Sequence, residues 1–311
     1  MSVFLLIVKF IAYYLTYSVS ILTDAFESIV NVVAGFIGVY SLYIAAKPRD
    51  ANHPYGHGKA EFLSAAIEGT LMLSAGGIII FNAIRGFLYP LPLHKLDQGI
   101  YLITITALIN FGAGFICVRK GRKNNSLALV ASGKHLKLDS YTTLGITGAL
   151  ALIFYTGLFW IDSAVAIFFG LVGIYSGYKI LRTSIAGIMD EADADLLKRM
   201  VNLLNTNRRE NWIDLHNLRI IKYGTVLHLD CHLTVPWYLN VAEAHAEIDA
   251  LGLLMRNEFG KSLELFVHSD PCLPFSCHIC DKRNCNVRNH NFEKKITWTL
   301  DNILQDKKHR L

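Results

Sequence analysis

The chain has 311 residues, of which 52% are hydrophobic and only 18% are charged, and its formal net charge is +5. Soluble domains carry about 25% charged residues, so this composition argues against a wholly soluble protein. The positive charge lies mostly in short loops and in the tail, and the sequence has no nucleic-acid-binding signature or aromatic platform, so no nucleic-acid partner is expected.

Long apolar blocks occupy the first 188 residues. A helix needs roughly 20 apolar residues to cross a membrane. Six blocks satisfy or approach this length, at about 3–20, 22–46, 62–90, 99–118, 136–158 and 161–182. The first block contains Lys9 and lacks the basic leader and small-residue cleavage site of a secretory signal. Residues 1–188 are therefore predicted to form a bundle of six transmembrane helices.

The loops between these blocks differ in their basic residues. The second-to-third and fourth-to-fifth loops are rich in lysine and arginine, whereas the third-to-fourth loop contains one lysine and the fifth-to-sixth loop contains none. The basic residues are Lys47, Arg49, Lys59, Arg119, Lys120, Arg122, Lys123 and Lys134. Because basic loops stay in the cytoplasm, six spans place both termini on the cytoplasmic side.

Polar residues interrupt two of the predicted spans at helical spacing. Asp24, Glu27 and Asn31 lie at i, i+3 and i+7 in the second span, and His135 and Asp139 lie at i and i+4 in the fifth. Ionisable groups are costly in hydrocarbon and therefore mark functional sites. Two such stripes facing each other would provide the oxygen and nitrogen ligands of a four-coordinate divalent metal site.

Other interpretations of these polar groups stay open. The stripes would also be explained if they paired with each other or with Lys9 and only held the bundle together. In another interpretation, Asp24 does not bind metal itself but holds Glu27 in position to bind it. Glu68, in the third span, is either a proton shuttle or the partner of a basic residue.

The loop KPRDANHPYGHGKAEF follows the second span. It contains Asp50, His53 and His57, with the two histidines at i and i+4 and the carboxylate three residues before them. This spacing suits a divalent metal ion. Histidines in a surface loop are also commonly only solvated, so both interpretations stand.

Residues 189–271 are predicted to form a soluble α+β domain whose first residues, 189–196, are a linker. Its pattern indicates helix, strand, strand, helix and strand, an αββαβ order typical of a ferredoxin-like sandwich with its helices on one face of the sheet. VLHLDCHLTV alternates strictly, which places His228, Asp230 and His232 on the face opposite its apolar residues.

Residues 272–311 are predicted to form a cysteine-rich tail with a terminal helix at 291–304. Cys272, Cys277, Cys280 and Cys285 have the spacing C-x4-C-x2-C-x4-C. Cytoplasmic thiols stay reduced, so we expect a structural zinc site in preference to disulfides. A metal-sensing or metal-loading site and unligated thiols are the alternatives, and Cys272 would also suit a site in the preceding domain.

The chain resembles the cation diffusion facilitator family along nearly its whole length. The similarity is carried by SVSILTDAFESIVNVVAG, HPYGHGKAE, HLKLD and HSDPC, of which HPYGHGKAE is the most specific. The resemblance implies a homodimeric antiporter in the lipid bilayer that moves a divalent metal out of the cytoplasm against protons.

The resemblance also implies three metal sites. The matching positions are Glu27, Asn31, His135 and Asp139, with Asp24 beside them, for transport; Asp50, His53 and His57 in the loop; and His216, His232, His245, His268 and Asp270 in the C-terminal domain. Zinc exporters of the family usually have His or Asp followed by Asp where this chain has Glu27 and Asn31. The harder, less charged oxygen set makes manganese and iron(II) candidates beside zinc.

Two other functional classes have less support. A membrane metalloenzyme needs a signature such as HExxH, and neither this motif nor G-x-S-x-G occurs, so no catalytic residue is predicted. A membrane metal sensor that does not transport has no need for Glu27, His135 and Asp139 in lipid.

Overall fold

The computed structural model describes residues 2–89, 93–123, 127–223 and 226–311, without the side chains of 121–132 and of Lys134. The predicted basic residues Arg122, Lys123 and Lys134 therefore lie outside the described side chains. The chain divides into two compact units, Met1–Leu42 with Leu63–Ile185 and Tyr43–Phe62 with Ala186–Leu311, and each is described by itself.

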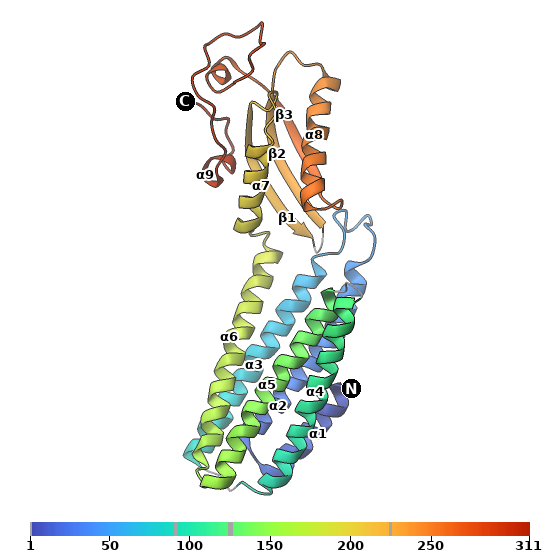
Figure 1. The fold of residues 1–311 in the computed structure, drawn as a ribbon, viewed down its shortest axis with the longest axis vertical. Coiled ribbons are helices and arrows are strands. Elements are labelled where there is room, and N and C mark those ends of the chain that lie inside the picture. The colour runs from blue at the N-terminus through green and yellow to red at the C-terminus, as the bar shows by residue number, and fades with distance from the viewer. Residues whose placement is uncertain (1, 90–92, 124–126, 224–225) are drawn as a thin grey trace. The chain divides into compact units, whose positions relative to one another are not determined.

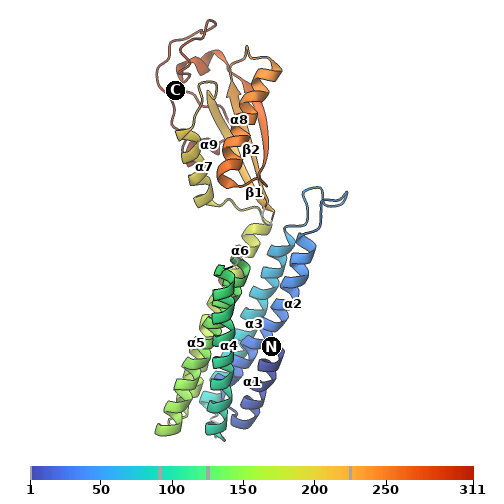
Figure 2. The same ribbon diagram turned by 45° about the vertical axis from the view of Figure 1, so that its right-hand side comes forward.

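Six helices form the first unit and run lengthwise beside one another (Figures 1 and 2). They are α1 (Ser2–Thr16), α2 (Val19–Ala45), α3 (Ala60–Leu88), α4 (Leu96–Lys123), α5 (Leu127–Thr156) and α6 (Trp160–Ile188). Of the helices described, α2, α3, α4 and α6 are long and apolar enough to cross a membrane. The six-helix prediction is confirmed, although the first helix ends earlier and the fifth begins earlier than expected.

Glycines allow α3 and α6 to pack closely. A Cβ atom on Gly69 would lie 2.9 Å from the carbonyl oxygen of Gly177, and one on Gly177 would lie 2.9 Å from that of Gly69. A Cβ atom on Gly76 would lie 3.0 Å from the carbonyl oxygen of Gly170. Such small-residue contacts stabilise helix pairs in lipid, where the hydrophobic effect does not hold helices together.

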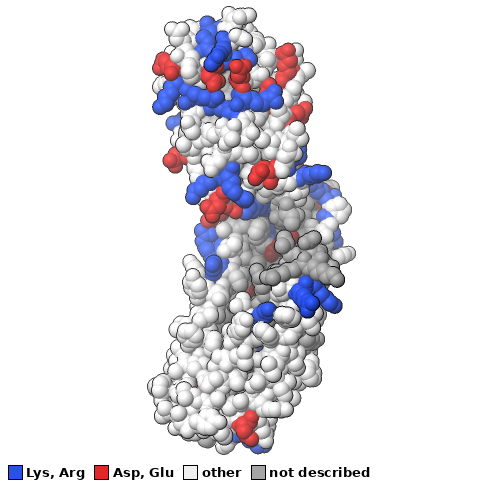
Figure 3. Space-filling view, viewed as in Figure 1, with Lys and Arg blue, Asp and Glu red and all other residues white. Residues whose placement is uncertain are grey.

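The surface of the first unit is largely uncharged. On the face drawn in Figure 3, most charged side chains belong to the second unit, and long stretches of the helices carry none. Large apolar side chains point outward, including Phe36 and Val39, each 71% exposed. Exposed apolar surface of this extent fits contact with lipid.

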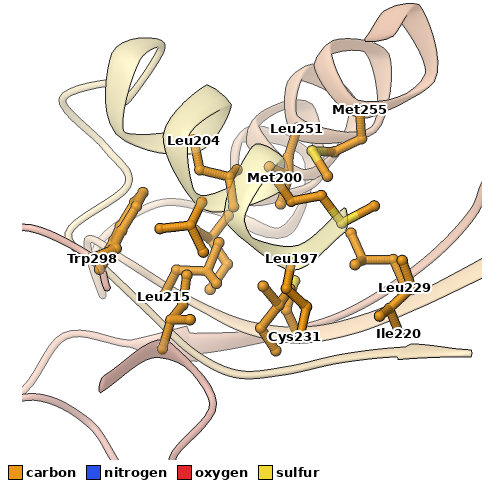
Figure 4. Packing of buried hydrophobic residues seen from close by; sticks show 14 of the residues in the cluster. Leu197, Met200, Leu204, Leu215, Ile220, Leu229, Cys231, Leu251, Met255 and Trp298 are labelled. Atoms are coloured by element: carbon orange, nitrogen blue, oxygen red, sulfur yellow. The ribbon is translucent and has the colours of Figure 1, made fainter. Parts of the chain in front are cut away.

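The second unit contains the predicted αββαβ order. Its elements are α7 (Ala194–Thr206), β1 (Asp214–Tyr223), β2 (Val226–Val235), α8 (Val241–Phe259) and β3 (Glu264–Pro271). The sheet has the order β1-β2-β3, with β1 antiparallel and β3 parallel to β2. Apolar side chains from α7, α8 and the sheet form one core, so both helices cover the same face of the sheet (Figure 4).

The predicted terminal helix at 291–304 is wrong except for its last turn. After the short 3-10 helix η1 (Pro274–His278), the only α-helix described in the tail is α9 (Leu300–Ile303). Trp298 is buried in the domain core. Nδ2 of Asn205 donates a hydrogen bond to the carbonyl oxygen of Trp298 at 2.7 Å, and the backbone N–H of Trp298 donates one to Oδ1 of Asn205 at 3.0 Å. The N–H and carbonyl oxygen of Trp298 are thus bonded to the side chain of Asn205 in α7 instead of to neighbouring turns of a helix.

Candidate metal sites

The polar stripes of α2 and α5 face each other. Asn31 donates a hydrogen bond from Nδ2 to Oδ2 of Asp139 at 2.9 Å. On the other side of the same carboxylate, Nε2 of His135 lies 3.8 Å from Oδ1 of Asp139. The two helices therefore bring an amide, a carboxylate and an imidazole side by side.

The side chain of Glu27 lines a small cavity that Asn31 also lines. Glu27 and Asn31 line a space of about 90 Å³ together with Thr142 of α5 and Ser176 of α6. Within the described chain, however, Glu27, His135 and Asp139 do not gather within 4.8 Å of one another. The predicted donors thus lie on facing helices without forming a compact ligand group.

Asp24 has a different environment. Its Oδ1 accepts a hydrogen bond from Nζ of Lys9 at 2.8 Å and one from Oγ1 of Thr143 at 2.8 Å. Lys9 also donates to Oγ of Ser28 at 2.8 Å, and the side chains of Lys9 and Asp24 are 3% and 2% exposed. The pairing with Lys9 that the sequence left open is therefore present for Asp24, and it joins α1, α2 and α5.

The histidine loop in the second unit is already folded around its carboxylate. Asp50, His53 and His57 place one ligand atom each within 4.8 Å of one another. Oδ1 of Asp50 lies 3.2 Å from Nδ1 of His53, and Oδ2 lies 3.4 Å from Nε2 of His57. The backbone N–H of His53, at 2.7 Å from Oδ1, lowers the pKa of Asp50 and so favours the carboxylate that a metal would need.

The strand register gathers a second ligand group in the C-terminal sheet. His216 of β1 stands opposite His232 of β2, and His232 stands opposite His268 of β3. His216 Nε2 and His232 Nδ1 lie 3.4 Å and 3.6 Å from Oδ2 of Asp270. His216, His232 and Asp270 thus lie within 4.8 Å of one another.

The other two predicted ligands of this domain lie outside that group of three. Nε2 of His268 is 3.6 Å from Oδ1 of Asp270, and its ring centroid is 4.8 Å from that of His232. His245, on α8, lines a cavity with Asp270, but its closest acidic partner is Asp249 at 3.7 Å. Burial lowers the pKa of His216, which favours the neutral imidazole that binds metal.

Sequence patterns did not reveal Asn217, which follows His216. It has a φ of 53° at the point where the β1–β2 register shifts between His216 and Arg219. Its Nδ2 lies 3.3 Å from Nε2 of His232. Asparagine tolerates this left-handed conformation better than most residues, so an asparagine inside a strand pattern was the available signal.

His228 is also placed differently from its strand neighbour His232. It is only 4% exposed, with Nδ1 lying 3.2 Å from Glu264 and its ring centroid 5.2 Å from that of Tyr223. His228 therefore lies in a buried environment, although it shares a strand face with His232.

Comparison with known proteins decides the family. Residues 1–189 match the cation efflux transmembrane domain, and residues 192–272 match the cytoplasmic domain of cation efflux proteins. The chain belongs to the cation efflux family. Membership confirms a membrane transporter and not an enzyme, and the protein is an integral multi-pass membrane protein.

Relatives of this cation efflux protein cover most of its length. An uncharacterised transporter of Synechocystis sp. is 32% identical over 77% of this chain and 77% of its own. The cation-efflux pump FieF of Escherichia fergusonii is 30% identical over 88% of this chain and 90% of its own. The cation-efflux pump FieF of Shewanella oneidensis is 27% identical, with 86% and 89% covered.

The cysteine-rich tail of this cation efflux protein begins where the family matches end. The four predicted cysteines line one cavity of about 50 Å³, and all four are free thiols. Arg288 donates hydrogen bonds to the carbonyl oxygens of Cys277 at 3.1 Å and Cys280 at 3.0 Å, which shapes the turn between them. No three of the cysteines belong to a ligand group within 4.8 Å in the described chain. The donor chemistry fits zinc, whereas the sulfur spacing is not that of a ready-made site.

Proposed function

We propose that this cation efflux protein exports a divalent transition metal from the cytoplasm in exchange for protons, with Glu27, Asn31, His135 and Asp139 as the transport site. The observation that carries the proposal is the 2.9 Å hydrogen bond between Asn31 and Asp139, which joins the polar stripes of α2 and α5. An amide and two carboxylates are costly to place in lipid-spanning helices, so their presence there supports a functional site.

Competition between metal and protons would drive the cycle. Carboxylates and imidazole bind metal only when they are deprotonated. Metal from the cytoplasm displaces a proton from His135 or from a carboxylate, the helices then open the site outward, and external protons displace the metal. Imidazole suits this exchange because it changes charge near physiological pH.

The ligand set defines a class of metal. Glu27 and Asp139 offer carboxylate oxygens, Asn31 offers an amide oxygen, and His135 offers nitrogen. Hard oxygen ligands suit manganese and iron(II), and the imidazole also suits zinc. We infer these three ions as the candidate substrates.

Two further sites would regulate transport. We assign Asp50, His53 and His57 to a loop site, and His216, His232 and Asp270 to a site in the C-terminal domain, with His268 and His245 at its edge. The match of residues 192–272 to the cytoplasmic domain of cation efflux proteins supports a homodimer with both termini in the cytoplasm. The basic loops support the same orientation.

Transport by purified protein in liposomes tests the main proposal. We expect zinc, manganese or iron(II) to enter vesicles under an imposed pH gradient, with proton movement in the opposite direction. Asp139→Asn should abolish both fluxes. Asp97→Asn, at the exposed start of α4, is the matched control and should transport normally. Metal binding without any flux by the unaltered protein would favour the alternative of a membrane metal sensor.

We also propose that Cys272, Cys277, Cys280 and Cys285 bind a structural zinc ion. The four thiols share a cavity, and binding would draw their sulfur atoms together. Elemental analysis should find one zinc fewer per chain in the double variant C277S/C280S. The single variant C117S, in α4, should keep the zinc content of the unaltered protein, and equal zinc content in the two variants would contradict the site.

A further inference from the structure

The last residues of the chain form a strap alongside His216, His232 and Asp270, the candidate ligands that we call the metal group of the C-terminal sheet. We define the C-terminal strap as residues 305–310, which follow α9 and lie beyond both family matches. Buried Ile303 anchors α9 in the domain core just before the strap begins. The carbonyl oxygen of Gln305 then accepts a hydrogen bond from the backbone N–H of Asn217 at 2.9 Å. The strap thus reaches the β1 bulge, whose asparagine side chain faces His232.

Lys308 brings a positive charge to the metal group itself. Its Nζ lies 3.6 Å from Oδ1 of Asp270 and donates a hydrogen bond to the carbonyl oxygen of Pro271 at 2.9 Å. The side chains of Lys308 and Asp270 are 19% and 15% exposed, so water screens this pair only in part. The other oxygen of Asp270 faces His216 and His232. One carboxylate therefore serves the ammonium group on one side and two candidate metal ligands on the other.

His309 contacts the same group through a second carboxylate. Its Nδ1 lies 2.5 Å from Oδ1 of Asp214, and its backbone N–H donates to Oδ2 at 2.9 Å. Oδ2 of Asp214 in turn lies 3.6 Å from Nδ1 of His216. The strap therefore contacts Asp270 directly. It also contacts Asp214, which lies beside His216, and Asn217, which lies beside His232.

We propose that the C-terminal strap competes with metal for the site formed by His216, His232 and Asp270. Lys308 neutralises Asp270 before metal binds, and a divalent ion at the site repels the ammonium group and displaces it from the carboxylate. The strap therefore lowers the affinity of the site, and metal binding loosens the strap, because the coupling between two binding events is reciprocal. The inference rests on the metal site proposed for this domain.

Zinc binding to the full-length protein in detergent tests this competition. A titration against a competing chelator would compare K308Q with K307Q, each alone and combined with H232A. The two lysine variants remove the same charge at adjacent positions, but Lys307 is exposed and lies outside the contacts with Asp270. We expect K308Q to tighten the site that H232A removes by about tenfold. K307Q should leave it unchanged, and K308Q should have no effect when combined with H232A.

Limited proteolysis gives a second, independent measurement on the unaltered chain. Zinc should speed tryptic cleavage after Lys307 and Lys308, because metal displaces the strap. In H232A, zinc should leave the cleavage rate unchanged. This measurement does not depend on how well a strap variant folds.

The outcomes separate the two proposals. Equal affinities in K308Q and K307Q, or a strap that zinc protects from trypsin, would overturn the competition while leaving the site in place. The absence of any zinc site sensitive to H232A would overturn the site and the competition together. The transport proposal depends on Asp139 and is decided by flux, so it stands or falls separately.

Discussion

The α2–α5 stripes and the C-terminal sheet carry similar candidate metal ligands, but the ligands lie closer together in the sheet than between the helices. In the sheet, strand register places His216, His232 and Asp270 within 4.8 Å of one another. Between α2 and α5, Asn31 and Asp139 are hydrogen-bonded and His135 lies 3.8 Å from Asp139, but within the described part of the chain Glu27, His135 and Asp139 do not form a group of three within 4.8 Å. Donors on adjacent strands are fixed by ladder hydrogen bonds, but donors on separate helices move with their helices.

This difference matches the two tasks that we propose. A regulatory site must recognise metal without releasing it across a barrier, so a fixed group of ligands suits it. A transport site must bind on one side and release on the other, and ligands on two helices allow this because a rigid-body shift separates them. Variants that affect one site and spare the other test the comparison.

The largest effect is expected at Asp139, which joins the two stripes. Asp139→Asn removes a negative ligand but keeps the size of the side chain, so metal flux into liposomes should fall to the level of empty vesicles. Zinc binding at the sheet site should be unchanged, as measured by the part of binding that H232A removes. Residual flux well above the empty-vesicle level would place the transport site elsewhere.

A large effect on stability is expected at Lys9. Lys9→Met leaves the carboxylate of Asp24 buried without its ion-pair partner, which costs about 3–5 kcal/mol. Thermal unfolding in detergent should show a loss of the helical unit's stability. The double variant K9M/D24N should recover much of it, because no unpaired charge remains.

If K9M is as stable as the unaltered protein, the buried ion pair is not what joins α1, α2 and α5. Asp24 would then be available as a fifth metal ligand in the membrane. Transport by D24N distinguishes these cases: a structural Asp24 should leave metal selectivity unchanged.

A smaller effect is expected at the β1 bulge. Substitutions there test whether strand register holds the ligands of the sheet site in place. Asn217→Val forces a β-branched residue into a left-handed conformation that costs about 1–2 kcal/mol. Zinc affinity at the sheet site should fall by about tenfold as the bulge relaxes. Asn217→Gly keeps the backbone and removes only the amide near His232, so it should retain more affinity than the valine variant.

The sequence predicted what depends on local spacing and missed what depends on distant contacts. The helical intervals of Asp24, Glu27 and Asn31 and of His135 and Asp139 identify faces that the structure brings together. The bulge at Asn217 and the contact between Lys308 and Asp270 depend on register and on a tail folding back, which no local pattern encodes. The helix predicted at 291–304 failed for the same reason, since burial of Trp298 overrode its local preference.

The smallest effect concerns Asp193, which lies outside both sites and serves as a reference for pure stability. It caps α7 by accepting a hydrogen bond from the N–H of Leu196 at 2.9 Å. A hydrogen bond from Lys222 at 2.5 Å is the main cause of the lowered pKa of Asp193, and the bond from Leu196 adds to it. Asp193→Ala should therefore cost about 1 kcal/mol at pH 7 without changing metal affinity.

The pH dependence of this cost follows from the direction of the shift. A carboxylate whose pKa is lower in the folded chain stabilises it above the unfolded pKa of about 3.9, and this contribution disappears as the pH falls through the folded value. The difference in unfolding temperature between D193A and the unaltered protein should therefore be constant near neutrality and shrink below about pH 4. Asp195→Ala, in the first turn of the same helix with an exposed ion pair, should show almost no difference at any pH. A pH-independent loss in D193A would mean that the side chain stabilises α7 without any contribution from its negative charge.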